Sequence, residues 1–111
     1  MIECREDPRI AVEIPISFSM IGHSATREGT MFDISAGGCA VTSAASVPPG
    51  TGVKLLIRSV DLAAPITVQS AAVRWARHGE FGVEFLDLAE LDRGRLRRLL
   101  RFATPRSTIQ H

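Results

Sequence analysis

Two short clusters in the sequence carry polar side chains that core packing does not require. Arg5 and Arg9 lie four residues apart in an N-terminal segment without apolar periodicity. The planar fork of a guanidinium suits bidentate recognition of a phosphate or a guanine. The second cluster runs from Asp33 through Ser35 to Gly38 and places a carboxylate, a hydroxyl and a glycine where a strand is expected to end. Taken singly, the clusters also fit a chance arginine pair and an ordinary turn in which Asp or Ser bonds its own backbone.

No pattern in the sequence predicts catalysis. The HExxH, GxSxG, GxGxxG and P-loop motifs are missing, so neither a metalloprotease, a hydrolase nor a nucleotide-cleaving site is indicated. The three histidines, His23, His78 and His111, fall in expected turns and at the terminus. Cys4 and Cys39 are not in a CxxC or CxxH spacing, so no zinc site or disulfide scaffold is expected. We expect a protein that is not an enzyme and that has no metal or cofactor.

Length and composition indicate one globular domain. The chain has 111 residues, of which 45% are hydrophobic and 23% are charged, as is ordinary for a chain that buries a single core. No apolar run approaches the roughly 18 residues that span a membrane, and the N-terminus is too polar for a signal peptide. We therefore expect a cytoplasmic protein without membrane insertion.

Charge is unevenly distributed along the chain. Residues 1–92 carry 7 basic and 12 acidic side chains, whereas residues 93–111 carry 6 arginines and no acid. The simplest interpretation of the basic stretch is that cations near the C-terminal end of a helix complement its dipole. We expect no nucleic-acid partner, because the acidic remainder repels phosphate and the chain has no tyrosine and one tryptophan from which to build a stacking platform.

Hydrophobic alternation predicts a fold made mainly of strands. Every even position from Ile10 to Met20 is apolar, which is the period-two pattern of a strand with one buried face. Pro15 falls on the opposite face, so the strand is expected either to have an unpaired stretch there or to lie at an edge of the sheet. Five more strands are expected around residues 29–34, 39–43, 53–57, 66–75 and 81–85. Six short strands without an intervening helix predict a mainly β fold, a six-stranded antiparallel β-barrel.

The fifth predicted strand, residues 66–75, changes the parity of its apolar positions partway along. A β-bulge near Ser70 would reconcile the two halves. Trp75 shares its parity with Val73, which predicts that the indole packs in the core. Arg74 is then expected to point outward.

A C-terminal amphipathic helix is expected over residues 87–104. Asp87 and Glu90 have the spacing of a capping box, and Pro105 marks the stop. One apolar stripe is formed by Leu88, Leu91, Leu96, Leu99, Leu100 and Ala103. The chain thus divides into a mobile N-terminal segment (1–9), a barrel (10–86), a helix (87–104) and a tail (105–111).

Taken together, the two clusters resemble the PilZ domain family. The motifs of that family are RxxxR in an N-terminal switch segment and (D/N)xSxxG at the end of a strand. They are matched here by Arg5, Arg9, Asp33, Ser35 and Gly38. The later strands and the closing helix also follow in the order of the family, so the resemblance covers nearly the whole chain.

The resemblance implies a receptor for the bacterial second messenger cyclic di-GMP, with a single PilZ-like domain over about residues 5–102. It implies that the arginines bind phosphate and guanine, that Asp33 accepts from guanine N1–H and N2–H, and that Ser35 donates to a phosphate or base oxygen. Gly38 would let the backbone turn and the ligand approach. The ligand would order the mobile N-terminal segment, which would wrap it against the barrel, and an unidentified downstream protein effector would read the changed surface.

Four further residues are expected as secondary contacts of the ligand: Cys4, Gly37, Arg74 and Trp75. Some family members have an additional arginine at the position of Cys4 that looks suited to a second, stacked ligand, so one bound ligand is expected here. The alternative interpretation is a PilZ-fold adaptor that docks a protein partner and binds no nucleotide. The oligomeric state is left open.

Overall fold

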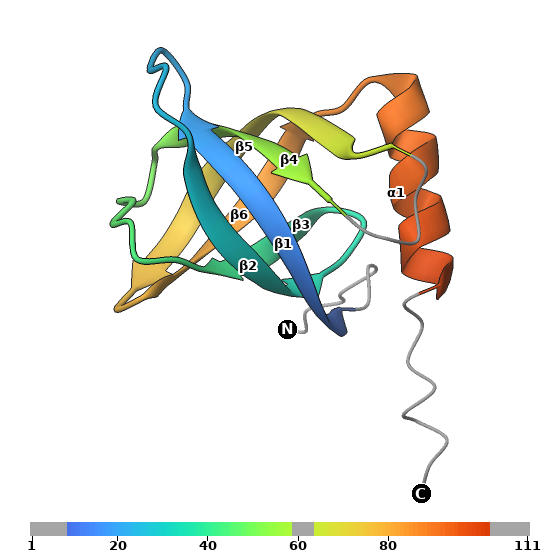
Figure 1. Cartoon of the computed structure of the whole chain (residues 1–111), viewed down its shortest axis with the longest axis horizontal. Helices are drawn as coiled ribbons and strands as arrows, with labels where there is room; N and C mark the ends of the chain where they lie inside the picture. Colours follow the sequence, from blue (N-terminus) through green and yellow to red (C-terminus); the bar gives the residue numbers. More distant parts are fainter. Residues whose placement is uncertain (1–8, 59–63, 103–111) are drawn as a thin grey trace, which may run out of the picture.

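Six strands and one helix form the protein in a computed structural model that describes residues 9–58 and 64–102. In chain order they are β1 (Ile10–Met20), β2 (Arg27–Ile34), β3 (Gly38–Thr42), β4 (Gly52–Ile57), β5 (Ile66–Arg77), β6 (Glu80–Asp87) and α1 (Glu90–Phe102). The strands pair antiparallel in the order β1-β2-β3-β6-β5-β4, and β4 pairs back to β1 to close a barrel (Figure 1). The predicted mainly β fold, a six-stranded antiparallel barrel with a C-terminal helix, is confirmed.

The alternating apolar side chains fill the inside of the barrel. Phe18 in β1 and Phe81 in β6 meet edge to face with ring centroids 5.1 Å apart, which joins the two strands across the core. Burial of apolar surface, worth about 25 cal/mol for each Å² removed from water, is the main force that holds such a barrel together. The largest fully buried side chains are Phe18, Phe81, Ile16, Met31, Ile34, Leu55, Ile57, Ile66, Leu99, Val41, Val53 and Val68.

Pro15 marks the place where one side of β1 loses its partner. It pairs with Thr30 of β2, but pairing with β4 begins only at the next residue, where Ile16 lies opposite Ile57. Because proline lacks a backbone N–H, it is tolerated at the end of the ladder. The predicted interruption is therefore confirmed on the β4 side, although β1 is not an edge strand.

Two register shifts bend β5. The first lies between Val68 and Ala71, which face Leu55 and Val53 of β4, and it is the bulge that the change of parity predicts. The second lies between Val73 and Trp75. An extra residue in one strand reverses the direction of the side chains that follow, so Trp75 is turned out of the core, as described below.

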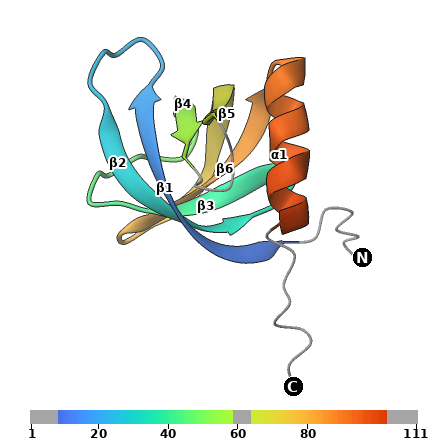
Figure 2. The ribbon, with the colours of Figure 1, turned by 45° about the vertical axis from the view of Figure 1, so that its right-hand side comes forward.

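The helix α1 lies along the outside of the barrel (Figures 1 and 2). It buries Leu96 and Leu99, which are 2% and 1% exposed. The carboxylate of Asp92 accepts a hydrogen bond from the backbone N–H of Thr67 in β5, with N and Oδ1 2.9 Å apart. In the described residues, no helix has the length and apolar character needed to cross a membrane.

The start of α1 differs from the prediction. Asp87 is the last residue of β6, and the helix begins at Glu90. The N–H of Arg93 donates to the carbonyl of Ala89 at 2.9 Å, so Ala89 rather than Asp87 stands at the helix cap, and the capping-box prediction is wrong. Leu91 is 66% exposed instead of buried, because at about 100° per residue it lies about 80° from Leu99 and about 140° from Leu96 around the helix.

Candidate ligand-binding site

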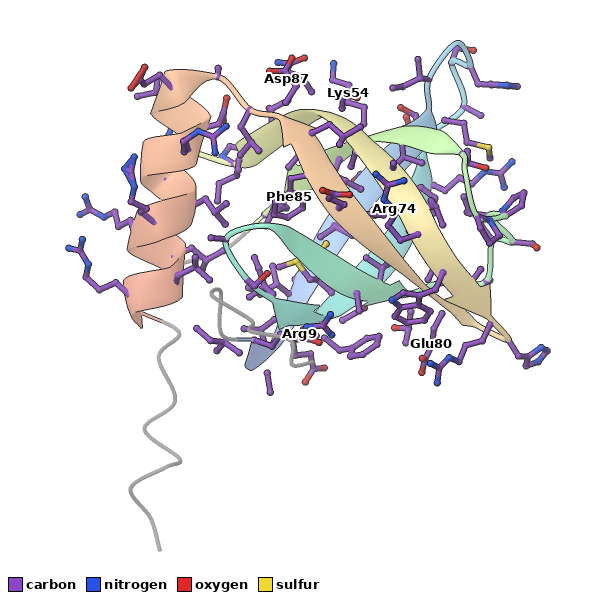
Figure 3. The ribbon with its side chains drawn as sticks, turned by 180° about the vertical axis from the view of Figure 1, so that it is seen from behind. Arg9, Lys54, Arg74, Glu80, Phe85 and Asp87 are labelled. Carbon is purple, nitrogen blue, oxygen red and sulfur yellow. The ribbon has the colours of Figure 1, made fainter. Side chains whose placement is uncertain are left out.

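The structure brings Arg9 of the first cluster next to Asp33 of the second. Pairing of Ile10 with Ile34, and of Ala11 with Asp33, places the start of β1 beside the end of β2. Arg9 Nη1 donates to Asp33 Oδ2 at 3.1 Å, and the two side chains are 53% and 21% exposed. The ion pair is thus open to solvent and to a ligand. Figure 3 shows Arg9 on the outside of the barrel.

Two of the predicted residues, Arg5 and Cys4, lie outside the described residues. So do the predicted N-terminal segment before Arg9 and the tail. The structure therefore places Arg9, but not Arg5, beside the second cluster.

The turn between β2 and β3 is held by its own polar atoms. The N–H of Ser35 donates to the carbonyl of Gly38 at 2.9 Å, and the N–H of Gly37 donates to Ser35 Oγ at 3.2 Å. The carbonyl of Gly37 accepts from the N–H of Phe85 in β6 at 2.8 Å. Ser35 Oγ also donates to the carbonyl of Gly38, at a long 3.4 Å. The hydroxyl has a local turn role, and its weak donor bond can be exchanged for a bond to a ligand.

Gly38 allows β3 to approach β6. A Cβ atom at this position would lie 2.2 Å from the carbonyl oxygen of Val83, which no real side chain tolerates. The backbone of Gly38 is not in the left-handed region. In this structure the close approach that requires glycine is therefore to β6.

Four residues on four adjacent strands form a row across the outer face. Asp33 of β2 is paired with Ala40 of β3, Ala40 with Gly82 of β6, and Gly82 with Trp75 of β5. With neighbouring strands about 4.8 Å apart, the backbones of Asp33 and Trp75 are separated by roughly 14 Å. Ala40, which is 3% exposed, and the buried Gly82 lie between the charged end and the aromatic end of this row.

Trp75 lies on the outer face and not in the core, contrary to the prediction. A Cβ atom on Gly82 would fall 2.2 Å from Trp75 Nε1, so the indole covers this glycine from outside. Arg77 places its Cζ 4.8 Å from the centroid of the indole ring, a cation–π distance. The bulge after Val73 causes the reversal, and no feature of the alternation reveals it. The sequence signal that we missed is Gly82, which pairs with Trp75 and leaves room for the indole on the outer face.

The chain is similar to known proteins in both sequence and fold. The sequence matches the family model of the PilZ domain over residues 3–102. The chain belongs to the PilZ domain family. No functionally curated protein matched the sequence directly.

Solved structures show the same fold as this PilZ domain. The Bacillus subtilis inhibitor of motility MotI/DgrA superposes with a TM-score of 0.75 at 21% identity, and the match covers 99% of this chain but 54% of that one. The present chain thus spans about half the length of that protein. The PilZ domain of CeSA from a cellulose-synthesizing bacterium gives 0.67 at 21% identity, covering 86% of this chain and 96% of that one. The PilZ domain of Escherichia coli YcgR with c-di-GMP gives 0.64 at 15% identity, covering 91% and 92%.

Arg74 of this PilZ domain is already engaged. Its guanidinium forms an ion pair with Glu84 in β6, with Nη2 and Oε1 2.7 Å apart and both side chains about half exposed. Glu84 pairs with Gly38, so this ion pair stands next to the β2–β3 turn. Figure 3 shows Arg74 and Arg9 on the same side of the barrel. Glu84 is a neighbour of the site that sequence reasoning missed.

Cys39 lies beneath the site and contributes no reactive thiol. It is buried in the core, and burial together with the nearby charge of Asp33 raises the pKa of Cys39 to about 12. The thiol is therefore protonated at neutral pH and is a poor nucleophile and metal ligand. Among the described residues, no group of three or more His, Cys, Asp or Glu side chains is placed to hold a metal ion.

Proposed function

We propose that this PilZ domain is a receptor for cyclic di-GMP, which it binds on the outer face around Arg9 and Asp33. The observation that carries the proposal is the 3.1 Å juxtaposition of these two side chains beside the Ser35–Gly38 turn. Family membership supports it, as does the solved structure of the YcgR domain with c-di-GMP, which shares the fold.

Each side chain has a role that its chemistry allows. The Arg9 guanidinium donates a fork of N–H groups to guanine O6 and N7 or to a phosphate. The Asp33 carboxylate accepts from guanine N1–H and N2–H, and the Ser35 hydroxyl donates to an oxygen of the ligand. The ligand replaces the Arg9–Asp33 ion pair, and an exposed pair of this kind is worth only about 0–1 kcal/mol. Opening it therefore opposes binding weakly.

The other end of the row adds a surface for a base. The indole of Trp75 is partly exposed above Gly82, and stacking of a base on an aromatic ring contributes about 1–3 kcal/mol. We assign Arg5 and Gly38 to the same site by the family motif, with Gly37, Arg74 and Cys4 as further neighbours. Arg5 and Arg9 close over the ligand together, and a partner protein reads the resulting surface. The domain performs no bond chemistry in this role.

Isothermal titration of cyclic di-GMP tests the proposal. The Arg9→Ala and Asp33→Ala variants are each expected to bind about 10-fold to 150-fold more weakly, because each loses charge-assisted hydrogen bonds worth about 1.5–3 kcal/mol. Arg27→Ala removes an equally exposed arginine from β2, outside the site, and should bind as the wild type does. GTP should not compete.

Thermal unfolding separates lost binding from lost folding. Since the Arg9–Asp33 pair is exposed, Arg9→Ala should leave the melting temperature of the free protein nearly unchanged. Saturating ligand should raise the melting temperature of the wild type but not that of the variant. If the wild type shows neither heat nor thermal stabilisation, the receptor function is refuted and the PilZ-fold adaptor without a nucleotide is favoured.

A further inference from the structure

The outer face of α1 carries a row of arginines that pair with no acidic side chain in the described part of the chain. Arg93, Arg97 and Arg101 are exposed and lie four residues apart, along one side of the helix. Within residues 9–58 and 64–102, no carboxylate forms an ion pair with any of the three. Figure 3 shows nitrogen-tipped side chains projecting from the side of α1 that faces away from the barrel.

The helix dipole does not explain this row. Cations are favourable in the last turn of a helix, and of the three only Arg101 lies there. Arg93 is in the first turn, close to Glu90, where the dipole disfavours a positive charge. Like charges four residues apart also repel each other on a helix surface. Neither the dipole nor the contacts among the three arginines therefore favours Arg93 or Arg97 in the isolated domain.

A glycine on the outer face of α1, next to Arg93, is equally unexplained by the domain itself. Gly94 lies inside α1, where glycine destabilises a helix relative to alanine. A Cβ atom at this position would meet no heavy atom within 4 Å. No neighbour in the described structure therefore needs the missing side chain, in contrast to Gly38 and Gly82. Glycine in such a place permits another backbone to approach closely.

We propose that the face formed by Arg93, Gly94, Arg97 and Arg101 docks an acidic helix of a partner protein. The partner helix packs over Gly94, and its carboxylates, spaced four residues apart, pair with the three guanidinium groups. A guanidinium forms bidentate hydrogen bonds with a carboxylate. The arginines are four residues apart, and carboxylates four residues apart also lie on one side of a partner helix.

The surroundings of this face favour an acidic helix over a nucleic acid. The basic face extends over a single helix about 20 Å long, and Asp87 and Glu90 stand at its N-terminal end. A duplex would bring phosphates against these carboxylates, and phosphate binding gains from many cations spread along the backbone. A narrow line of arginines beside a glycine fits a second helix better.

A synthetic helical peptide with glutamate at every fourth position and alanine at the central crossing tests the proposal. Its control has the same composition in scrambled order. We expect the full-length domain to bind the patterned peptide about tenfold more tightly than the scrambled one at physiological ionic strength. Duplex DNA and phosphatidylcholine vesicles containing phosphatidylglycerol are titrated in parallel, with and without cyclic di-GMP.

Two variants and a matched control decide the outcome. Arg93→Gln/Arg97→Gln/Arg101→Gln and Gly94→Leu should each remove the preference for the patterned peptide, while circular dichroism shows that both remain folded. The control, Arg27→Gln/Lys54→Gln/Arg58→Gln, removes three exposed cations elsewhere and should keep the preference. No discrimination between the peptides, an equal loss in the control, or tighter binding to DNA or vesicles than to the patterned peptide overturns the proposal.

Discussion

The outer sheet face and the outer face of α1 differ in how their unusual residues are explained. On the sheet face, Gly38 lies under the backbone of Val83, and Gly82 lies under the indole of Trp75. On α1, Gly94 lies under nothing in the described residues. The arginines on the two faces differ in the same way. Arg9 and Arg74 form ion pairs with carboxylates of the domain, whereas the arginine row on α1 has no carboxylate partner among the described residues.

This difference separates residues that serve the domain from residues that serve an external molecule. A glycine that the domain itself requires gives no information about a partner, whereas a glycine that only weakens its own helix does. The two faces also meet, because the C-terminal end of α1 and the start of β1 lie at the same end of the molecule in Figures 1 and 2. A partner on α1 would thus be near the residues that we assign to the ligand.

The largest effect is expected from Gly38→Ala, which tests the sheet side of the comparison. The new Cβ would lie 2.2 Å from the carbonyl oxygen of Val83, so β3 and β6 must separate. Overpacking of this kind should lower the free energy of unfolding by about 3 kcal/mol, measured by urea denaturation. A loss below the error of the measurement would show that the two strands yield easily and that the glycine is not required.

Trp75→Ala tests the aromatic end of the row. If the ligand stacks on the indole, its affinity should fall about tenfold, because base stacking contributes about 1–3 kcal/mol. Gly82→Ala should give a similar loss, since its Cβ displaces the indole. Titration at low and high salt sharpens the comparison: the loss for Trp75→Ala should be independent of salt, whereas the loss for Arg9→Ala should shrink as salt rises. Unchanged affinity in both ring variants would remove Trp75 from the site.

The buried thiol makes the sheet region sensitive to alkaline pH. The pKa of Cys39 rises from 9.0 to about 12 on folding, so the folded state holds its proton more tightly than the unfolded state does. The stabilisation is complete below pH 9 and is lost as the pH rises toward 12. The free energy of unfolding should fall by about 1 kcal/mol between pH 8 and pH 10. Urea denaturation of Cys39→Ala at both pH values should show a smaller fall. An equal fall in the two proteins would assign it to other groups.

The smallest effect is expected on α1, and it has the opposite sign. Gly94→Ala should raise the free energy of unfolding by about 0.5–1 kcal/mol, because alanine favours the helix and its Cβ meets nothing within 4 Å. The same substitution that harms the domain at residue 38 should thus help it at residue 94. A destabilised Gly94→Ala variant would indicate that the domain itself needs this glycine, and it would weaken the argument for docking.

Much of the fold could be predicted because its signals are local. The alternation from Ile10 to Met20, the bulge near Ser70 and the interruption at Pro15 all follow from the spacing of apolar residues and proline along one strand. The helix was expected at the right place, but its start was not. The capping-box pattern at Asp87 did not decide the helix start, because Asp87 pairs with Ser70 of β5 and so extends β6. Tertiary context of this kind overrides a local helix preference.

The sequence by itself determined the strand order along the chain, the apolar side of each strand and the two polar clusters, because these depend on residue type and spacing. Only the tertiary structure decided that Arg9 meets Asp33 and that Trp75 lies outside above Gly82. It also decided that Gly38 serves the contact with β6. These are contacts between strands distant in sequence, and a single bulge reverses which face a side chain occupies. Closure of the barrel sets such contacts, and no local pattern encodes them.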